Sequence, residues 1–291
     1  MRIINKCMLL IVGGLLGITS VGCSSTSKEK SEEKKIQVSV SIVPQKTFVE
    51  KVCGDLAEVN VMIPPGNSPA NYEPTPKEIE DFSKSEIYFS IGVPTETANI
   101  LPAVNSETET VELAKLVNEV YPDRKMGENR DPHIWLSPKR AMVMVQEISD
   151  TMCELDKDNS KTYTENAEKY INELKKLDKD LKDATSNMET KKFIVFHPAF
   201  GYLADDYGLE MYSLEQNGKE ATADHLMEMI DLAKEEKIET IFYQAEIDSS
   251  QSESFAEEIG GETAMLAPLS PDYIDNMEIM IETISKGSDN E

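Results

Sequence analysis

Residues 159–187 read NSKTYTENAEKYINELKKLDKDLKDATSN, a stretch that contains neither glycine nor proline. Its apolar side chains recur at every third or fourth position, which places them on one face of a helix. These are Tyr163, Ala167, Tyr170, Leu174, Leu177 and Leu181. At about 1.5 Å per residue the helix would be about 40 Å long, enough to run beside a whole lobe. The stretch therefore predicts one long rigid helix; two shorter helices meeting at a kink are the alternative.

Short apolar segments alternate with helical patterns on both sides of this helix, as in α/β lobes with parallel sheets. Before it we expect strands at 36–43, 58–63 and 87–91, and helices at 46–53, from Thr75-Pro76, after Pro94 and at 138–154. After it we expect strands at 192–197, 210–214, 239–243 and 262–266, and helices at 200–207, 222–236, 250–259 and 271–285. The prediction is an α/β fold in which lobes 36–157 and 189–288 are joined by helix 158–188, with a ligand cleft between the lobes.

The start of the chain has the pattern of a processing segment. Arg2 and Lys6 precede the apolar run 8–21, which is too short to span a bilayer and is typical of a signal peptide. Cys23 follows a small residue and precedes a polar tract, as in the lipobox of bacterial lipoproteins. Residues 1–23 are therefore predicted to be a lipoprotein signal ending at the anchor Cys23, and residues 24–35 a flexible tether. An extracytoplasmic protein, lipid-anchored to the outer face of the bacterial cytoplasmic membrane, is the expectation; an ordinary cleaved signal is the alternative.

The chain is strongly acidic, with 54 Asp and Glu against 29 Lys and Arg and a formal net charge of −25. Such a charge repels nucleic acid, so no nucleic-acid partner is expected. Beyond the leader only Cys53 and Cys153 remain, and no CxxC pair is present. We expect both to be free thiols, although the spacing does not exclude a disulfide.

Two of the three histidines stand next to prolines. The stretch Asp131-Pro-His-Ile-Trp-Leu-Ser-Pro138 presents His133 from a segment bracketed by prolines, which predicts a stiff, non-helical loop. His197 ends the apolar run that begins at Phe193 and is followed at once by Pro198. Imidazoles on rigid backbone are what a metal site needs, because its ligands must converge with little loss of entropy.

Several polar segments follow expected strands, and ligands in open α/β sheets bind at the carboxyl ends of strands. His197 and the pair Gln244 and Glu246 lie there, as does the loop after Ile63. Two facing lobes would bring these segments and the loop of His133 into one cleft.

Four motifs carry a resemblance to a known family. They are PGNSPANYEPTP at 65–76, DPHIWLSP at 131–138, HPAFGY at 197–202 and LAPL at 266–269. Together with the leader, tether and central helix, they resemble the zinc/manganese-type solute-binding lipoproteins of ABC transporters over nearly the whole mature chain. The resemblance implies a monomeric binding protein, not an enzyme, that passes a divalent metal to a membrane permease and carries no organic cofactor. A role in cell adhesion, with transport lost, is an alternative.

The resemblance assigns two metal ligands, His133 and His197. Ala70 and Ala267 occupy the places where that family usually has a third histidine and an aspartate, and neither can coordinate a metal. Glu246 or Gln244 could replace them, as could water or, less readily, Tyr72, Glu73 or Asp272. The ligand could instead be a metal chelate in a cleft enlarged by the alanines, or another small solute.

Other readings of the chemistry are weaker. A metal-dependent hydrolase lacks support because the chain has neither HExxH nor GxSxG. His225 is expected on the surface of its helix. The methionines in helical segments are expected in the core, namely Met142, Met144, Met227, Met229, Met277 and Met280.

Overall fold

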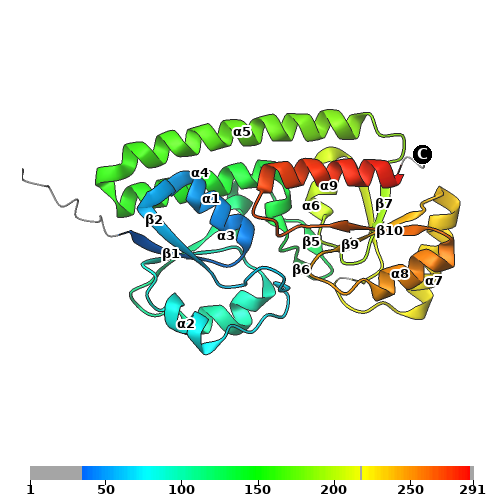
Figure 1. Cartoon of the computed structure of the whole chain (residues 1–291), viewed down its shortest axis with the longest axis horizontal. Helices are drawn as coiled ribbons and strands as arrows, with labels where there is room; N and C mark the ends of the chain where they lie inside the picture. The colour runs from blue at the N-terminus through cyan, green and yellow to red at the C-terminus, as the bar shows by residue number, and fades with distance from the viewer. Residues whose placement is uncertain (1–34, 217, 289–291) are drawn as a thin grey trace, which may run out of the picture. The chain divides into compact units, whose positions relative to one another are not determined.

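Two four-stranded, all-parallel sheets lie one after the other along the same side of one long helix in the computed structural model, which describes residues 35–216 and 218–288 (Figure 1). The strands of the first sheet run in the order β2-β1-β3-β4 and those of the second in the order β10-β9-β7-β8. Their bounds are β1 Ile36–Val40, β2 Ala57–Val61, β3 Ile87–Ser90 and β4 Glu109–Glu112, then β7 Lys192–Val195, β8 Glu210–Ser213, β9 Thr240–Gln244 and β10 Glu262–Leu266. A two-stranded antiparallel hairpin joins β5 Lys125–Met126 to β6 Asn129–Arg130. The predicted fold class, two parallel-sheet lobes joined by a long helix, is confirmed.

Helices cover both sheets. In the first lobe they are α1 Val43–Cys53, α2 Pro76–Phe82, α3 Leu113–Val120 and α4 Pro138–Leu155. In the second lobe they are α6 Gly201–Tyr207, α7 Ala223–Glu236, α8 Ser250–Ile259 and α9 Tyr273–Ser288. Shorter turns are η1 Gly54–Leu56, η2 Glu96–Ile100, η3 Leu101–Ala103, η4 Ile134–Leu136 and η5 Lys157–Asn159. Thr75 begins α2 as predicted, because its hydroxyl accepts the N–H of Glu78 while the Glu78 carboxylate accepts the N–H of Thr75.

The connecting helix α5, Ser160–Ser186, is a single 27-residue helix with its predicted apolar stripe buried. It packs on α1 and α4 of the first lobe and on α6 and α9 of the second. Because one unbroken helix contacts both lobes, it fixes them along a common support.

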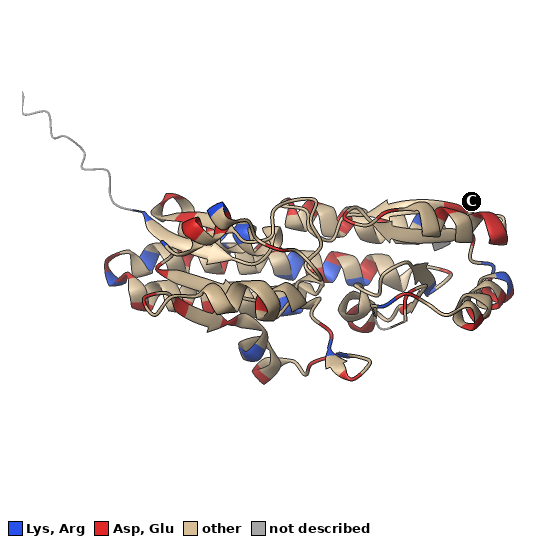
Figure 2. Ribbon diagram, turned by 90° about the horizontal axis from the view of Figure 1, so that it is seen from below, with Lys and Arg blue, Asp and Glu red and all other residues tan. Residues whose placement is uncertain are grey.

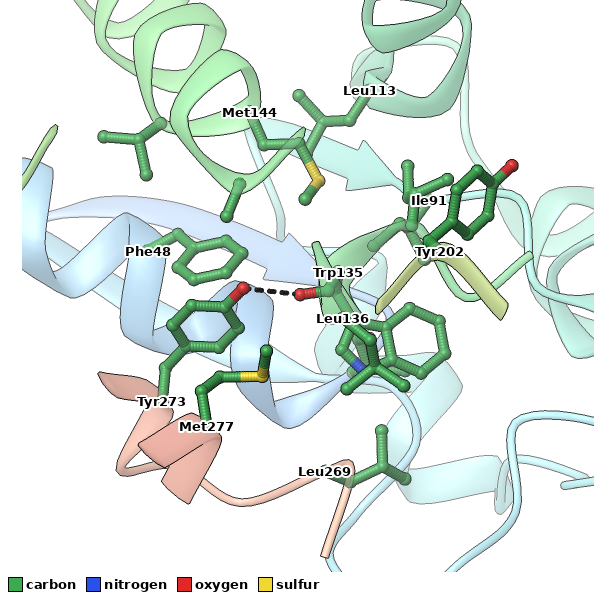
Figure 3. Packing of buried hydrophobic residues seen from close by; sticks show 14 of the residues in the cluster. Phe48, Ile91, Leu113, Trp135, Leu136, Met144, Tyr202, Leu269, Tyr273 and Met277 are labelled. Carbon is green, nitrogen blue, oxygen red and sulfur yellow. Dashed lines mark hydrogen bonds between the residues drawn. The ribbon is translucent and has the colours of Figure 1, made fainter. Parts of the chain in front are cut away.

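The larger of two hydrophobic clusters in the described residues runs through both lobes, and the smaller lies within the second lobe. Phe48 and Met144 of the first lobe share the larger cluster with Tyr202, Tyr273 and Met277 of the second (Figure 3). The described residues belong to one compact unit. Ion pairs add to the contact between lobes: Arg124 pairs with Asp205 at 3.1 Å and Arg140 with Asp206 at 3.0 Å. The lobes are therefore packed against each other and not merely tethered.

Several local predictions were wrong. The first strand ends at Val40 and α1 begins at Val43, because Pro44 fits the first turn of a helix, where no N–H is needed. The helix after Pro94 is only a π-helical turn, η2, followed by a 3-10 turn, η3. The loop of His133 is not wholly non-helical, since η4 forms a 3-10 turn directly after it.

Two side-chain placements also differ. His225 is not on the surface: its side chain is 15% exposed and its Nε2 bonds to the carbonyl oxygen of Ser213 at 2.9 Å. Met227 is exposed, whereas Met144, Met277 and Met280 are buried as predicted. Cys53 and Cys153 are both free, as expected. The predicted signal, Cys23 and all but the last residue of the predicted tether lie outside the described residues.

Candidate metal centre

His133 is held by a buried carboxylate. It lies directly after the β5–β6 hairpin and is 7% exposed, while Asp131 is fully buried. Asp131 Oδ1 accepts the backbone N–H of His133 at 3.0 Å and lies 2.7 Å from its Nδ1. The other oxygen, Oδ2, accepts a hydrogen bond from Arg124 at 3.2 Å. With Nδ1 bonded to Asp131, Nε2 is the ring nitrogen left for a ligand.

His197 has the same arrangement from the other lobe. It follows β7, and its Nδ1 lies 2.6 Å from Oε2 of Glu215, which follows β8. Their side chains are 14% and 19% exposed. A carboxylate on the far nitrogen orients an imidazole and makes it a stronger metal ligand. In both histidines Nε2 is the ring nitrogen that is not bonded to a carboxylate.

The pKa values of His133 and Asp131 are both shifted by their surroundings. Desolvation lowers the pKa of His133, the Asp131 carboxylate opposes that effect, and the charges of His197 and Arg130 lower the pKa further. Burial alone would raise the pKa of Asp131, but hydrogen bonds from His133 and the charges of His133 and Arg124 bring it below its ordinary value. His133 is therefore favoured as the neutral imidazole that binds metals.

The spacing of the two rings fits one shared metal ion. Their centroids are 5.3 Å apart, with an interplanar angle of 73°. A ring bound through Nε2 at about 2.0–2.1 Å has its centroid roughly 3.2 Å from the metal, so two rings at a tetrahedral angle lie roughly 5.2 Å apart. The observed centroid distance is thus close to that of two imidazoles on one tetrahedral ion.

Both histidines line a cavity of about 700 Å³. Gln244, the last residue of β9, and Glu246, two residues further, line it as well. Burial raises the pKa of Glu246. Among the described residues, however, no group of three or more His, Cys, Asp or Glu side chains is arranged to hold a metal. The two imidazoles are in place, and Glu246 shares their cavity without completing a three-ligand set.

The remaining residues named in the sequence analysis add no metal ligand beside the two histidines, Gln244 and Glu246. Ala70 lines the cavity, but Ala267 is not among the lining residues. Tyr72 is bonded to Glu78, and Glu73 and Asp272 are exposed elsewhere. His225 also lies outside the cavity lining.

Sequence reasoning missed the residues that support the histidines. Asp131 stands inside the quoted DPHIWLSP motif, where its position two residues before His133 was a usable signal. Glu215 follows an expected strand end but lies 18 residues from His197, and only the pairing of β7 with β8 brings the two together. Arg130, which lines the cavity, gave no signal beyond its place beside the motif.

The chain thus has two parallel-sheet lobes on one connecting helix, with imidazoles from both lobes at a shared cavity. The family model of ZnuA, "Zinc-uptake complex component A periplasmic", matches residues 38–287, and the chain belongs to this family. The family is one of transport binding proteins.

Relatives and solved structures agree with that assignment. The chain is 28% identical to the zinc-binding lipoprotein AdcA of Streptococcus pneumoniae, with 98% of this chain and 62% of AdcA covered, so it spans less than two thirds of that relative. It is 29% identical to the high-affinity zinc uptake system protein ZnuA of Bacillus subtilis, with 90% and 88% covered. A crystal structure of a ZnuA deletion mutant with zinc bound superposes with a TM-score of 0.82 at 32% identity, covering 89% of this chain and all of that one.

More distant structures share only the fold. The periplasmic zinc-binding protein TroA of Treponema pallidum has a TM-score of 0.82 at 18% identity, and covers 88% of this chain and 99% of that one. The laminin-binding protein of Streptococcus agalactiae has a TM-score of 0.77 at 21% identity, and covers 86% and 100%. The adhesion alternative gains no support from this level of likeness.

Proposed function

We propose that this chain is the extracytoplasmic binding protein of an ABC importer, capturing divalent zinc between its lobes for delivery to a permease. The observation that carries the proposal is the pair His133 and His197, which come from different lobes, lie 5.3 Å apart and are each bonded through Nδ1 to a carboxylate.

Zinc is favoured over manganese by the donor atoms. Imidazole nitrogen suits zinc, whereas manganese prefers oxygen ligands. The names of the relatives AdcA and ZnuA also point to zinc. Manganese remains the second candidate of the same class.

Two nitrogens alone make a weak site, because zinc prefers four ligands or three and an open position. Glu246 is the protein ligand placed best to add an oxygen, since it lines the cavity and burial favours pairing its charge with a cation. Gln244 is the second choice because its amide oxygen is neutral. Water completes the shell.

Delivery requires a partner in the membrane. None of the helices in the described part of the chain is long and apolar enough to cross a bilayer. We propose that a lipid on Cys23 holds the protein at the outer face of the cytoplasmic membrane, beside its permease. Because the lobes share a core and one connecting helix, release involves a small adjustment and no wide hinge opening.

Calorimetric titration of zinc into metal-free protein tests the proposal. Wild-type protein should bind one zinc, and His133→Ala and His197→Ala should each weaken binding at least about 100-fold through the loss of one of two imidazoles. His225→Gln is the matched control, because it removes a histidine outside the cavity lining and should leave the affinity unchanged. Wild-type protein that binds neither zinc nor manganese would end the proposal.

A further inference from the structure

The cavity around the two histidines is less acidic than the rest of the chain. Asp and Glu outnumber Lys and Arg 54 to 29 over the sequence and recur on both lobes (Figure 2). The residues that line the cavity reverse this ratio, with two basic side chains, Arg130 and Lys219, and one acidic side chain, Glu246. Asp131 and Glu215 also lie at the site, but each is already bonded to the Nδ1 of a histidine, so Glu246 is the one acidic side chain that faces the cavity among its lining residues.

Arg130 is held in the wall by backbone groups and not by a carboxylate. Its Nη2 donates to the carbonyl oxygens of Ile91 at 3.0 Å and Gly92 at 2.9 Å, and its Nη1 donates to that of Asp131 at 3.3 Å. It makes no ion pair within the described ranges 35–216 and 218–288. The guanidinium has five N–H donors. Nε and one hydrogen of Nη1 therefore remain for a ligand.

The Arg130 guanidinium can lie this close to the backbone because residue 92 is a glycine and has no side chain. A Cβ on Gly92 would lie 2.1 Å from Nη2 of Arg130, and the φ of +82° is one that other residues rarely adopt. The backbone at Ile91 and Gly92 is also held by the Glu96 carboxylate, which accepts the N–H groups of both residues at 2.7 Å. The positive charge is thus placed by a rigid turn.

The charge of Arg130 also reaches the metal ligands. Arg130 lies three residues before His133, and both side chains line the cavity. The Arg130 guanidinium, whose charge also acts on Glu96, would repel a dication bound between the histidines. An anion between the metal and Arg130 would turn this repulsion into two attractions.

The size of the cavity fits such an anion. Its volume of about 700 Å³ lies in the range of small-molecule sites, about 300–1,000 Å³, whereas a water takes only about 30 Å³. Ala70 contributes a methyl group to the wall and no metal ligand. The protein therefore supplies the imidazole nitrogens of His133 and His197 and leaves space in the cavity for further metal ligands.

We propose that the site takes zinc as a complex with a small carboxylate chelator, whose oxygens complete the metal shell while one carboxylate bonds to Arg130. Lys219, which also lines the cavity, adds a second positive charge for the chelator. This inference rests on the proposed function, because it needs zinc on His133 and His197.

Equilibrium dialysis with zinc and radiolabelled citrate tests it. Purified protein is dialysed against zinc alone, citrate alone, and both together, and each retained species is counted. Citrate should be retained only when zinc is present, at one per protein, and should not reduce the zinc retained. Iminodiacetate and malate are run in the same way, so that the outcome does not depend on one chelator.

Arg130→Gln should lower citrate retention at least about tenfold, as expected for the loss of a charge-assisted hydrogen bond, while zinc alone is still retained. Lys125→Gln is the matched control, because it removes one positive charge from the same hairpin at a residue that does not line the cavity. Circular dichroism checks that both variants are folded.

The results separate the two proposals. Zinc retained alone, with none of the three chelators held and citrate merely stripping the metal, overturns the chelate inference and leaves zinc binding intact. An Arg130→Gln protein that retains citrate as wild type does also overturns it. No zinc retained in any arm instead removes the proposed function itself.

Discussion

Tyr273 and Trp135 join the two lobes through a buried hydrogen bond, in which the Tyr273 hydroxyl donates to the Trp135 carbonyl oxygen at 2.7 Å (Figure 3). Tyr273 begins α9 of the second lobe, and Trp135 lies two residues after His133 in the first. The indole of Trp135 in turn donates to the carbonyl oxygen of Pro268 at 2.9 Å. The metal-site loop is thus bonded directly to the opposite lobe.

Tyr273→Phe should lower the free energy of unfolding by about 1–2 kcal/mol, because the buried Trp135 carbonyl oxygen would lose its hydrogen bond. Urea denaturation measures the change. Tyr212→Phe is the control: its hydroxyl bonds to an exposed Glu210 at 3.3 Å, so the loss should stay within about 0.5 kcal/mol. Equal effects of the two changes would argue against a special role for the bond between lobes.

Glu215→Gln should weaken zinc binding by about 10- to 100-fold, since a neutral amide replaces the carboxylate that orients His197 and increases its basicity. Asp131→Asn should do the same to His133, with an added loss of stability because Arg124 also loses a buried partner. Titration calorimetry gives the affinities, and Glu210→Gln on neighbouring β8 serves as the control. Unchanged affinity in Glu215→Gln would mean that His197 does not bind the metal.

Zinc binding should weaken as the pH falls, because protons compete for the same groups. The lowered pKa of His133 keeps it neutral to a lower pH than an ordinary histidine. Burial raises the pKa of Glu246, so between its ordinary and raised values zinc must displace a proton from the carboxyl group. Glu246→Gln should therefore bind more weakly and release fewer protons in that range.

Calorimetry in buffers of different ionisation enthalpy counts the released protons. A Glu246→Gln protein with wild-type affinity and proton release would exclude Glu246 from the metal shell and leave Gln244, water or a chelator as the source of the remaining ligands.

How far the sequence predicts the fold depends on how strongly each element is patterned. The stripe from Tyr163 to Leu181 predicted α5 because every member of the stripe packs into the core, although the predicted bounds, 158–188, extend two residues beyond the helix at each end. Strand β4, Glu109–Glu112, was missed because it is a polar edge strand with largely exposed side chains. Helix α3, directly after it, was missed with it. Pairing with β3, not local propensity, makes β4 a strand.

The residues of the metal site likewise fall into those that the sequence predicts and those that only the folded structure shows. His133 and His197 could be predicted because rare residues beside prolines stand out locally. Glu215 and Arg130 could not, because their roles come from contacts that only the folded chain makes: the pairing of β7 with β8 for Glu215, and the approach of the hairpin to Gly92 for Arg130.

Cys53 should resist alkylation in the folded protein. Burial raises the pKa of its thiol to about 12, with the charges of Asp156 and Cys153 adding to the shift, so almost no thiolate exists at neutral pH. Treatment with iodoacetamide at pH 8, followed by peptide mapping, should find Cys53 unmodified and the partly exposed Cys153 modified. In urea, both should react. Rapid modification of Cys53 without denaturant would contradict its burial beneath α5.

Gly92→Ala should displace Arg130 while leaving both histidines in place. The new Cβ would meet Nη2 at 2.1 Å and Cζ at 3.2 Å, a clash that only movement of the guanidinium relieves. We expect this variant to retain zinc alone but to lose citrate retention as Arg130→Gln does, with about 1 kcal/mol lost from stability through the left-handed backbone. Gly208→Ala separates the two effects, because its φ of +68° imposes similar strain but nothing lies within 4 Å of its Cβ. If Gly92→Ala and Gly208→Ala lose the same stability and both keep citrate, the position of Arg130 against the turn does not govern chelator binding.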